Sequence, residues 1–172
     1  GGIREKEDLY NKIQFITTIT NIIAVAIENK RMAKESIRQA ALERELQLAA
    51  QMQSMLFPSN LVTHSFLDIA ATYIPHQSVG GDYYDFIKLN EDEALVCMAD
   101  VSGKGLSAAM LMSNFQANLH AIIRHTDFTL EGLVTELNAC VNLSARGEKF
   151  ITFFVARISE KNNTIHFINA GH

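Results

Sequence analysis

Residues 80–105 read GGDYYDFIKLNEDEALVCMADVSGKG and predict the centre of the fold. Residues 82–89 alternate well enough to be a strand. Residues 93–101 are almost continuously apolar, which indicates a strand buried on both faces. Asn90, Glu91 and Asp92 separate the two runs and are typical of a hairpin turn. The stretch therefore predicts two antiparallel strands, with glycines and an acid at one end of the pair.

The residues around this hairpin predict further strands and two helices. Apolar periodicity predicts strands over 67–75, 150–158 and 164–169, and helices over 103–125 and 129–144, the second with Thr129 as its N-cap. The order of elements after Pro58 is then three strands, two helices and two strands. Two strand groups separated by an antiparallel helix pair predict a layered α+β domain.

The N-terminal third has a different character. From residue 5 to Phe57 it contains neither glycine nor proline and is rich in good helix formers. A continuous helix of this length would measure roughly 75 Å at 1.5 Å per residue. Pro58 ends it, because the residue before proline disfavours the α conformation. We therefore expect a signalling or dimerisation helix over residues 1–57 and a globular domain over 58–172.

The apolar residues of this helix recur at spacings of three and four, from Ile16 to Ala40. A small domain cannot bury so long a stripe, which favours a homodimer through a parallel or antiparallel coiled coil. Two alternatives stay open. The helix could pack on a further domain, or it could be a solvated helix stabilised by Glu–Lys and Glu–Arg pairs.

Composition excludes several classes of function. The formal net charge is −4 and no basic stripe is present, which argues against a nucleic-acid partner. The most apolar early stretch, ITTITNIIAVAI, is too short to cross a membrane. Cys97 and Cys140 both lie in apolar runs and are interpreted as reduced thiols, which fits a cytoplasmic location.

Asp82 and Asp100 are the strongest candidates for chemistry. If one opens a strand and the other closes its antiparallel neighbour, their carboxylates face each other beside glycine-rich backbone. Hard cations such as Mg²⁺ and Mn²⁺ favour oxygen ligands of this kind. The residues alone also allow a plain turn at Gly80–Asp82 and a helix-capping role for Asp100.

Other catalytic patterns are not met. The SGKG stretch lacks the earlier glycine of a nucleotide-binding P-loop, and no serine lies in a GxSxG motif. The histidines form no HExxH-type pair.

Four ordered motifs, GGDYYDF, ADVSGKGLSAAMLM, FITFFVARI and NAGH, resemble the SpoIIE/RsbU-type branch of the metal-dependent (PPM) serine/threonine protein phosphatases. ELQLAAQMQSMLFP is similar to the helix that introduces this domain, and ITTITNIIAVAIENKRM to the closing helix of a GAF sensor domain. The resemblance implies an α-β-β-α sandwich, incomplete here, with a long coiled-coil-like N-terminal helix.

The same resemblance implies a site and a function. Asp82 and Asp100 would bind metal, Val101 would offer its backbone carbonyl, and Asp85 would orient metal-bound water. The centre would hold two Mn²⁺ or Mg²⁺ ions. The implied substrate is a phosphoserine or phosphothreonine protein, typically a STAS-type anti-sigma-factor antagonist in bacterial signal transduction.

The resemblance also implies further acids after His172, in strands beyond this chain. We accordingly expect this piece, as it stands, to bind metal poorly and to have little phosphatase activity. A non-catalytic dimerisation or scaffold module, in which the acids only form turns, is the alternative function.

Overall fold

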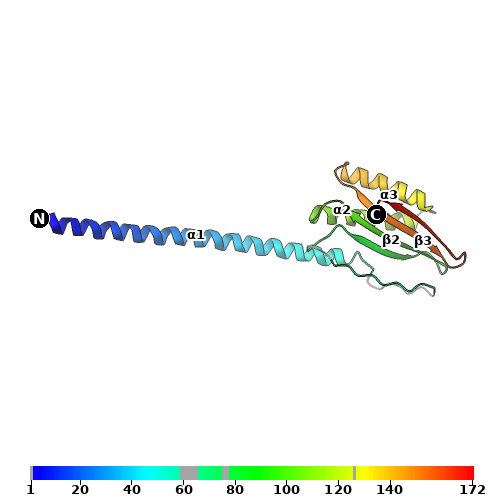
Figure 1. The fold of residues 1–172 in the computed structure, drawn as a ribbon, viewed down its shortest axis with the longest axis horizontal. Helices are drawn as coiled ribbons and strands as arrows, with labels where there is room; N and C mark the ends of the chain where they lie inside the picture. Colours follow the sequence, from blue (N-terminus) through cyan, green and yellow to red (C-terminus); the bar gives the residue numbers. More distant parts are fainter. Residues whose placement is uncertain (1, 59–65, 75–77, 126) are drawn as a thin grey trace. The chain divides into compact units, whose positions relative to one another are not determined.

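The computed structural model describes residues 2–58, 66–74, 78–125 and 127–172, and is shown as a ribbon in Figure 1. The chain divides into two compact units, one ending at Glu45 and the other spanning Leu46–His172. The mixed α+β class, the antiparallel sheet and the long N-terminal helix are confirmed. The domain boundary between residues 57 and 58 stays a prediction.

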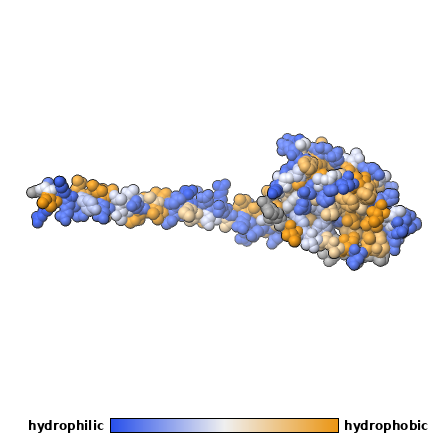
Figure 2. All heavy atoms as spheres, in the orientation of Figure 1, coloured by the Kyte–Doolittle hydropathy of each residue, from blue (hydrophilic) through white to orange (hydrophobic). Residues whose placement is uncertain are grey.

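Helix α1 (Gly2–Ser54) is uninterrupted, as the absence of glycine and proline predicted. Within the first unit every described side chain is exposed. Ion pairs three or four residues apart stabilise the exposed faces, with Lys12 2.7 Å from Asp8 and Arg31 2.7 Å from Glu28. Hydrophobic and hydrophilic side chains alternate along this unit in Figure 2. None of the described helices is long and apolar enough to cross a bilayer.

The second unit contains one antiparallel sheet of four strands in the order β1-β2-β3-β4. Its strands lie close to the predicted ranges: β1 (Tyr83–Lys88), β2 (Glu93–Val101), β3 (Ile151–Ser159) and β4 (Thr164–Ala170). Tyr83 lies opposite Ala99 in the first pair, and Ala99 lies opposite Phe153 in the second. This register assigns alternate residues of each strand to opposite faces.

Helices α2 (Leu106–His125) and α3 (Leu130–Ala145) contact each other and the sheet. Thr129 caps α3 as predicted, accepting a hydrogen bond of 3.1 Å from the Gly132 N–H. The core lies between these helices and the inner sheet face. Its largest fully buried side chains are Leu95, Cys97, Val101, Met112, Leu119, Leu133, Leu137 and Val155.

The outer face of the sheet corrects one prediction about β2. β2 is not buried on both faces, because Met98 on the outer face is 49% exposed while Cys97 beside it is fully buried. Phe167 and Ile165 of β4 are also exposed, and hydrophobic atoms gather over the strands in Figure 2.

The strand expected over 67–75 is wrong for its described part, 67–74, which contains only an isolated bridge at Leu67. Alternation of side chains is compatible with a strand, but a strand also needs a pairing partner.

Candidate functional site

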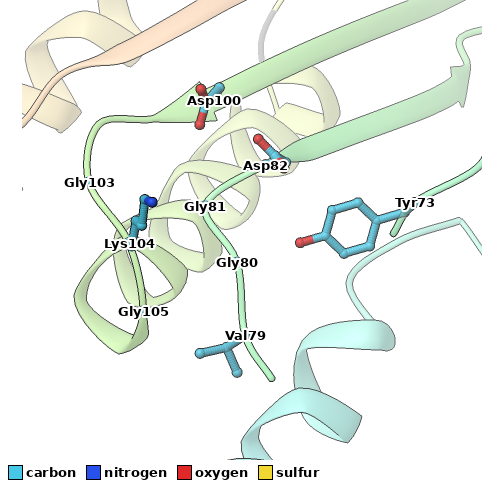
Figure 3. A pocket seen from close by; sticks show the side chains of 9 residues that line it. All are labelled: Tyr73, Val79, Gly80, Gly81, Asp82, Asp100, Gly103, Lys104 and Gly105. Carbon is cyan, nitrogen blue, oxygen red and sulfur yellow. The ribbon is translucent and has the colours of Figure 1, made fainter. Parts of the chain in front are cut away.

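Asp82 and Asp100 lie at the same end of the β1–β2 pair, as the sequence predicted. The register pairs Tyr83 with Ala99, so the next position outward places Asp82 opposite Asp100. Both acids line a pocket of about 280 Å³ with Tyr73, Lys104 and glycines of two loops. Figure 3 shows the two carboxylates at neighbouring strand ends, with the Tyr73 hydroxyl directed into the pocket.

The Gly80–Gly81 pair allows the close approach of backbone around Asp82. A Cβ at Gly80 would collide with the Tyr73 hydroxyl oxygen. A Cβ at Gly81 would lie 3.1 Å from the Val101 carbonyl oxygen and 3.2 Å from the Ala108 Cβ. These positions therefore favour glycine for reasons of space.

The loop after Asp100 is fixed from the other side by the start of β3. Ser102 donates its N–H to the Phe150 carbonyl over 2.9 Å, and its hydroxyl accepts the Phe150 N–H over 3.0 Å. The Lys149 ammonium donates to the Ser102 carbonyl at 3.0 Å. Gly103 and Gly105 complete the loop with φ values of +94° and +73°, which side chains rarely adopt. The backbone that carries Asp100 is thus held at several points.

The electrostatics of the pair favour a cation. Partial burial, then the charge of Asp100 and a hydrogen bond with it, raise the pKa of Asp82. Asp82 as a whole residue is more than one-third exposed, so its burial from water is incomplete. Two adjacent carboxylates repel each other, and a bound cation would remove that cost.

The residues present fit a divalent metal in part. Two carboxylates and the neighbouring Val101 carbonyl are hard oxygen donors, and the open pocket leaves room for water as further ligands. Among the residues that the structure describes, no group of three or more His, Cys, Asp or Glu side chains is gathered. The geometry is therefore that of a carboxylate pair which other ligands would complete.

Asp85 does not lie beside Asp82 and Asp100. It lies three residues after Asp82 along the strand, and its carboxylate is on the inner, helix-covered face, 6% exposed. It accepts hydrogen bonds from the Tyr83 hydroxyl at 2.6 Å and the Phe86 N–H at 2.8 Å. The His120 Nε2 of α2 lies 2.7 Å from the same carboxylate. Its contacts join β1 to α2, and the catalytic role suggested for Asp85 stays a prediction.

The pocket also involves residues that the sequence analysis did not select. Tyr73 and Lys104 line it, and the charge of His172 lowers the pKa of Asp82 against the larger opposing effects. The His172 Nδ1 lies 3.0 Å from the Thr152 hydroxyl, and Thr152 pairs with Asp100. His172 had one signal, its place in the NAGH motif. Tyr73 had none, because it precedes the glycines in a segment without regular structure.

Several known proteins are similar to this chain. Residues 90–172 match the family described as stage II sporulation protein E (SpoIIE). Phosphoserine phosphatase RsbU of Bacillus subtilis is 26% identical over 166 residues, which cover 96% of this chain. Over these residues the chain is similar to the SpoIIE/RsbU-type branch of the PPM phosphatases. Protein IcfG of Synechocystis is 28% identical over 170 residues, covering 83% of this chain.

Two solved structures share the fold of this chain. The SiaA-PP2C domain of Pseudomonas aeruginosa matches 75% of it and 53% of that domain's chain, with a TM-score of 0.62 and 18% identity. The RsbU and RsbW domains of Rv1364c from Mycobacterium tuberculosis match 56% of it and 27% of that chain, with a TM-score of 0.50 and 24% identity. The chain spans 48% of the length of RsbU and 27% of IcfG. That α1 contains the closing helix of a GAF domain stays a prediction.

Proposed function

We propose that this chain is part of a regulatory serine/threonine protein phosphatase that hydrolyses a phosphoserine or phosphothreonine protein. The observation that carries the proposal is the Asp82–Asp100 pair, opposed across two strand ends in a chain that is similar to the SpoIIE/RsbU-type branch. The pair has the oxygen donors and the mutual repulsion that a cation site requires. A scaffold whose acids only form turns would have no need for two adjacent carboxylates.

The chain's own residues have distinct roles in this proposal. Asp82 and Asp100 bind and orient the cations, and the Val101 carbonyl adds a neutral oxygen ligand. Two Mn²⁺ or Mg²⁺ ions, when bound, supply the positive charge that activates water and offsets charge on the phosphoryl oxygens. Lys104, an exposed cation beside the pocket, is placed to attract the phosphoryl group.

The relatives support the substrate class that we propose. We infer a STAS-type anti-sigma-factor antagonist carrying phosphoserine or phosphothreonine as the partner, in the cytoplasm. RsbU is named a phosphoserine phosphatase, and one matching structure joins RsbU and RsbW domains. Both cysteines are free, which suits a reducing compartment.

We also propose that α1 forms a homodimer with a second copy of the chain. Its apolar side chains are exposed throughout the first unit, for example Ile16 at 63% and Ile23 at 53%. A single helix cannot bury such a stripe, and a second identical helix can. This arrangement would let an upstream sensor act on the phosphatase through the helix.

The decisive experiment is an assay of Mn²⁺-dependent phosphate release from a serine-phosphorylated STAS domain. It compares this chain, a longer chain that continues beyond His172, and the longer chain with Asp82→Ala and Asp100→Ala together. We expect activity in the longer chain, little in the 172-residue chain, and none in the double variant. Full activity in the double variant would overturn the metal assignment, and no activity in any chain would favour the scaffold.

A further inference from the structure

The last turn of α1 is hydrogen-bonded to the loop that carries Asp82. The Gln53 side chain donates from Nε2 to the Gly80 carbonyl at 2.7 Å and accepts the Gly80 N–H at its Oε1 over 3.0 Å. The two residues are 27 positions apart in the chain. Because both amide atoms bind the same residue, the contact fixes the orientation of the Gly80 backbone as well as its position.

The surroundings of Gln53 make this contact costly to lose. Gln53 is 7% exposed, the one residue of α1 that is buried. The other residues of the groove around it are mostly apolar, among them Met52, Leu56, Val79 and Leu106. A buried amide in apolar surroundings must be hydrogen-bonded, and its removal would leave both backbone groups of Gly80 without these partners.

A second contact from the same region reaches Gly80. The Tyr73 ring stacks on Phe57, just after α1, with ring centroids 4.6 Å apart. The Tyr73 hydroxyl lies where a Cβ at Gly80 would be. The segment from Gln53 to Phe57 therefore restrains Gly80 through an amide pair and through an aromatic stack.

The restraint extends to Asp82 through one residue. Gly81 is confined by Val101 and Ala108, and its carbonyl accepts the Val101 N–H over 3.4 Å. Two Cα steps, at most about 7 Å of chain, separate Gly80 from Asp82. A pair of glycines is otherwise the most flexible backbone a chain can have, so such a loop needs external contacts to hold a ligand in place.

We propose that Gln53 is a positioning residue for Asp82: its paired hydrogen bonds to Gly80 hold the Asp82 loop so that the Asp82 carboxylate stays opposite Asp100. Asp100 has its own anchor at Ser102 and β3, so the two ligands are held by different parts of the fold. A displacement of the last turn of α1 would act first on Asp82, through Gly80, whereas Asp100 keeps its additional anchor at β3. The part of this proposal that concerns metal affinity rests on the proposed function.

The test compares Gln53→Leu and Gln53→Asn with the matched control Gln51→Leu on the same helix. Leucine lacks both hydrogen bonds, asparagine is one methylene too short to make the same pair, and Gln51 is exposed. The first readout is hydrogen exchange of the Gly80, Gly81 and Asp82 amides without metal. The second, on the longer chain that continues beyond His172, is the Mn²⁺ dissociation constant from the paramagnetic resonance of free Mn²⁺, with Asp82→Ala as the baseline.

We expect both Gln53 variants to exchange these amides at least about tenfold faster and to bind Mn²⁺ about tenfold more weakly. The Gln51 variant should stay within about twofold of the unsubstituted chain in both readouts. Near-ultraviolet circular dichroism identifies any variant that has lost its fold, and Gln53→Asn then replaces Gln53→Leu.

Three other outcomes would contradict either the role of Gln53 or the proposed metal centre. Unchanged exchange in a folded Gln53 variant would overturn the inference. Faster exchange with an unchanged Mn²⁺ dissociation constant would also overturn it, because the loop would then be ordered by Gln53 without positioning Asp82. If the longer chain that continues beyond His172 binds no Mn²⁺ above the Asp82→Ala baseline, the proposed metal centre fails, and exchange at Asp82 alone decides whether Gln53 restrains the loop.

Discussion

Asp82 lies directly opposite Asp100 at the open end of the β1–β2 pair, and burial, followed by the charge of Asp100, raises the pKa of Asp82. The fold therefore holds two like charges together at a solvent-accessible pocket. Such an arrangement costs stability in the absence of a cation, and functional sites often carry costs of this kind. Asp82 is therefore expected to lower the stability of the metal-free fold while providing a ligand for the metal.

Asp82→Asn should stabilise the metal-free chain at neutral pH. The pKa of Asp82 is raised in the fold, so its ionised form destabilises the folded state, and stability is regained as the pH falls through that raised pKa. We expect a gain of roughly 0.5–1 kcal/mol at pH 7.5, the size usual for exposed charge pairs. The gain should vanish near about pH 3, where carboxyls are protonated in both states.

Urea denaturation in the presence of a chelator measures this difference at each pH. Asp68→Asn, at an exposed carboxylate outside the pocket, is the matched control and should change little. A destabilised Asp82→Asn variant at pH 7.5 would show that the carboxylate makes a favourable contact in the folded chain.

Added Mn²⁺ or Mg²⁺ should raise the melting temperature of the longer chain that continues beyond His172, and removal by a chelator should reverse the effect. A ligand that binds only the folded state stabilises it by an amount that grows with the logarithm of its concentration. Asp82→Asn and Asp100→Asn should both lose this response, whereas Asp68→Asn should keep it. Differential scanning calorimetry over a Mn²⁺ series tests it, and an equal response in all four chains would indicate binding elsewhere.

Local patterns predicted most of the elements, because the packing they depend on is encoded in nearby residues. The β2 range is correct because an apolar run between a turn and a glycine loop has few other structures open to it. The prediction that β2 is buried on both faces was wrong, because burial of the outer face depends on what covers the sheet. The segment 67–74 failed for a related reason: its pairing partner is not specified by its own residues.

The site was predictable to the extent that it follows strand geometry. Asp82 and Asp100 face each other because hairpin pairing requires it. The same alternation places Asp85 on the opposite face from Asp82, and a resemblance of motifs does not show this. Gln53 could not be selected, because its partner is the backbone of a residue 27 positions away and its side chain is ordinary for a helix.

The Asp85 cluster should contribute to stability. Asp85→Ala removes a buried carboxylate that receives three hydrogen bonds and should cost about 3 kcal/mol or more. Burial, then the neighbouring Cys97 and Asp85, raise the pKa of Tyr83, so its hydroxyl stays protonated and donates at neutral pH. Tyr83→Phe keeps the ring and loses one hydrogen bond to a charged group, at a cost of about 1.5–3 kcal/mol.

Urea denaturation with a constant m value provides both numbers. Mn²⁺ binding by the folded Tyr83→Phe variant should match that of the unsubstituted chain. The opposite pattern, in which Asp85→Asn keeps its stability and loses Mn²⁺ binding, would place Asp85 in the metal centre after all.

The two cysteines should differ sharply in reactivity. Cys97 is fully buried, and burial, with the charge of Asp85 as a second cause, raises the pKa of its thiol. The thiolate that reacts with a disulfide reagent is therefore both rare and inaccessible there. Cys140 is half-buried on α3. We expect one thiol per chain to react within minutes at pH 8, and Cys140→Ser to abolish that phase; a fast phase in Cys140→Ser would show that the sheet opens readily.

Ile19→Lys with Ile23→Lys should convert the chain from dimer to monomer. Both side chains belong to the exposed apolar stripe of α1, and charges on a helix–helix seam oppose its burial. The matched control is Gln14→Lys with Asn21→Lys, which adds the same charge on the other side of the helix. Light scattering at high micromolar concentration should give a dimer for the unsubstituted and control chains and a monomer for the isoleucine variant.

The isoleucine variant should also lose helicity, because an isolated helix of this length depends on packing of its apolar face. A monomeric unsubstituted chain would exclude the coiled coil and leave the solvated helix, stabilised by pairs such as Arg31–Glu28, as the correct interpretation.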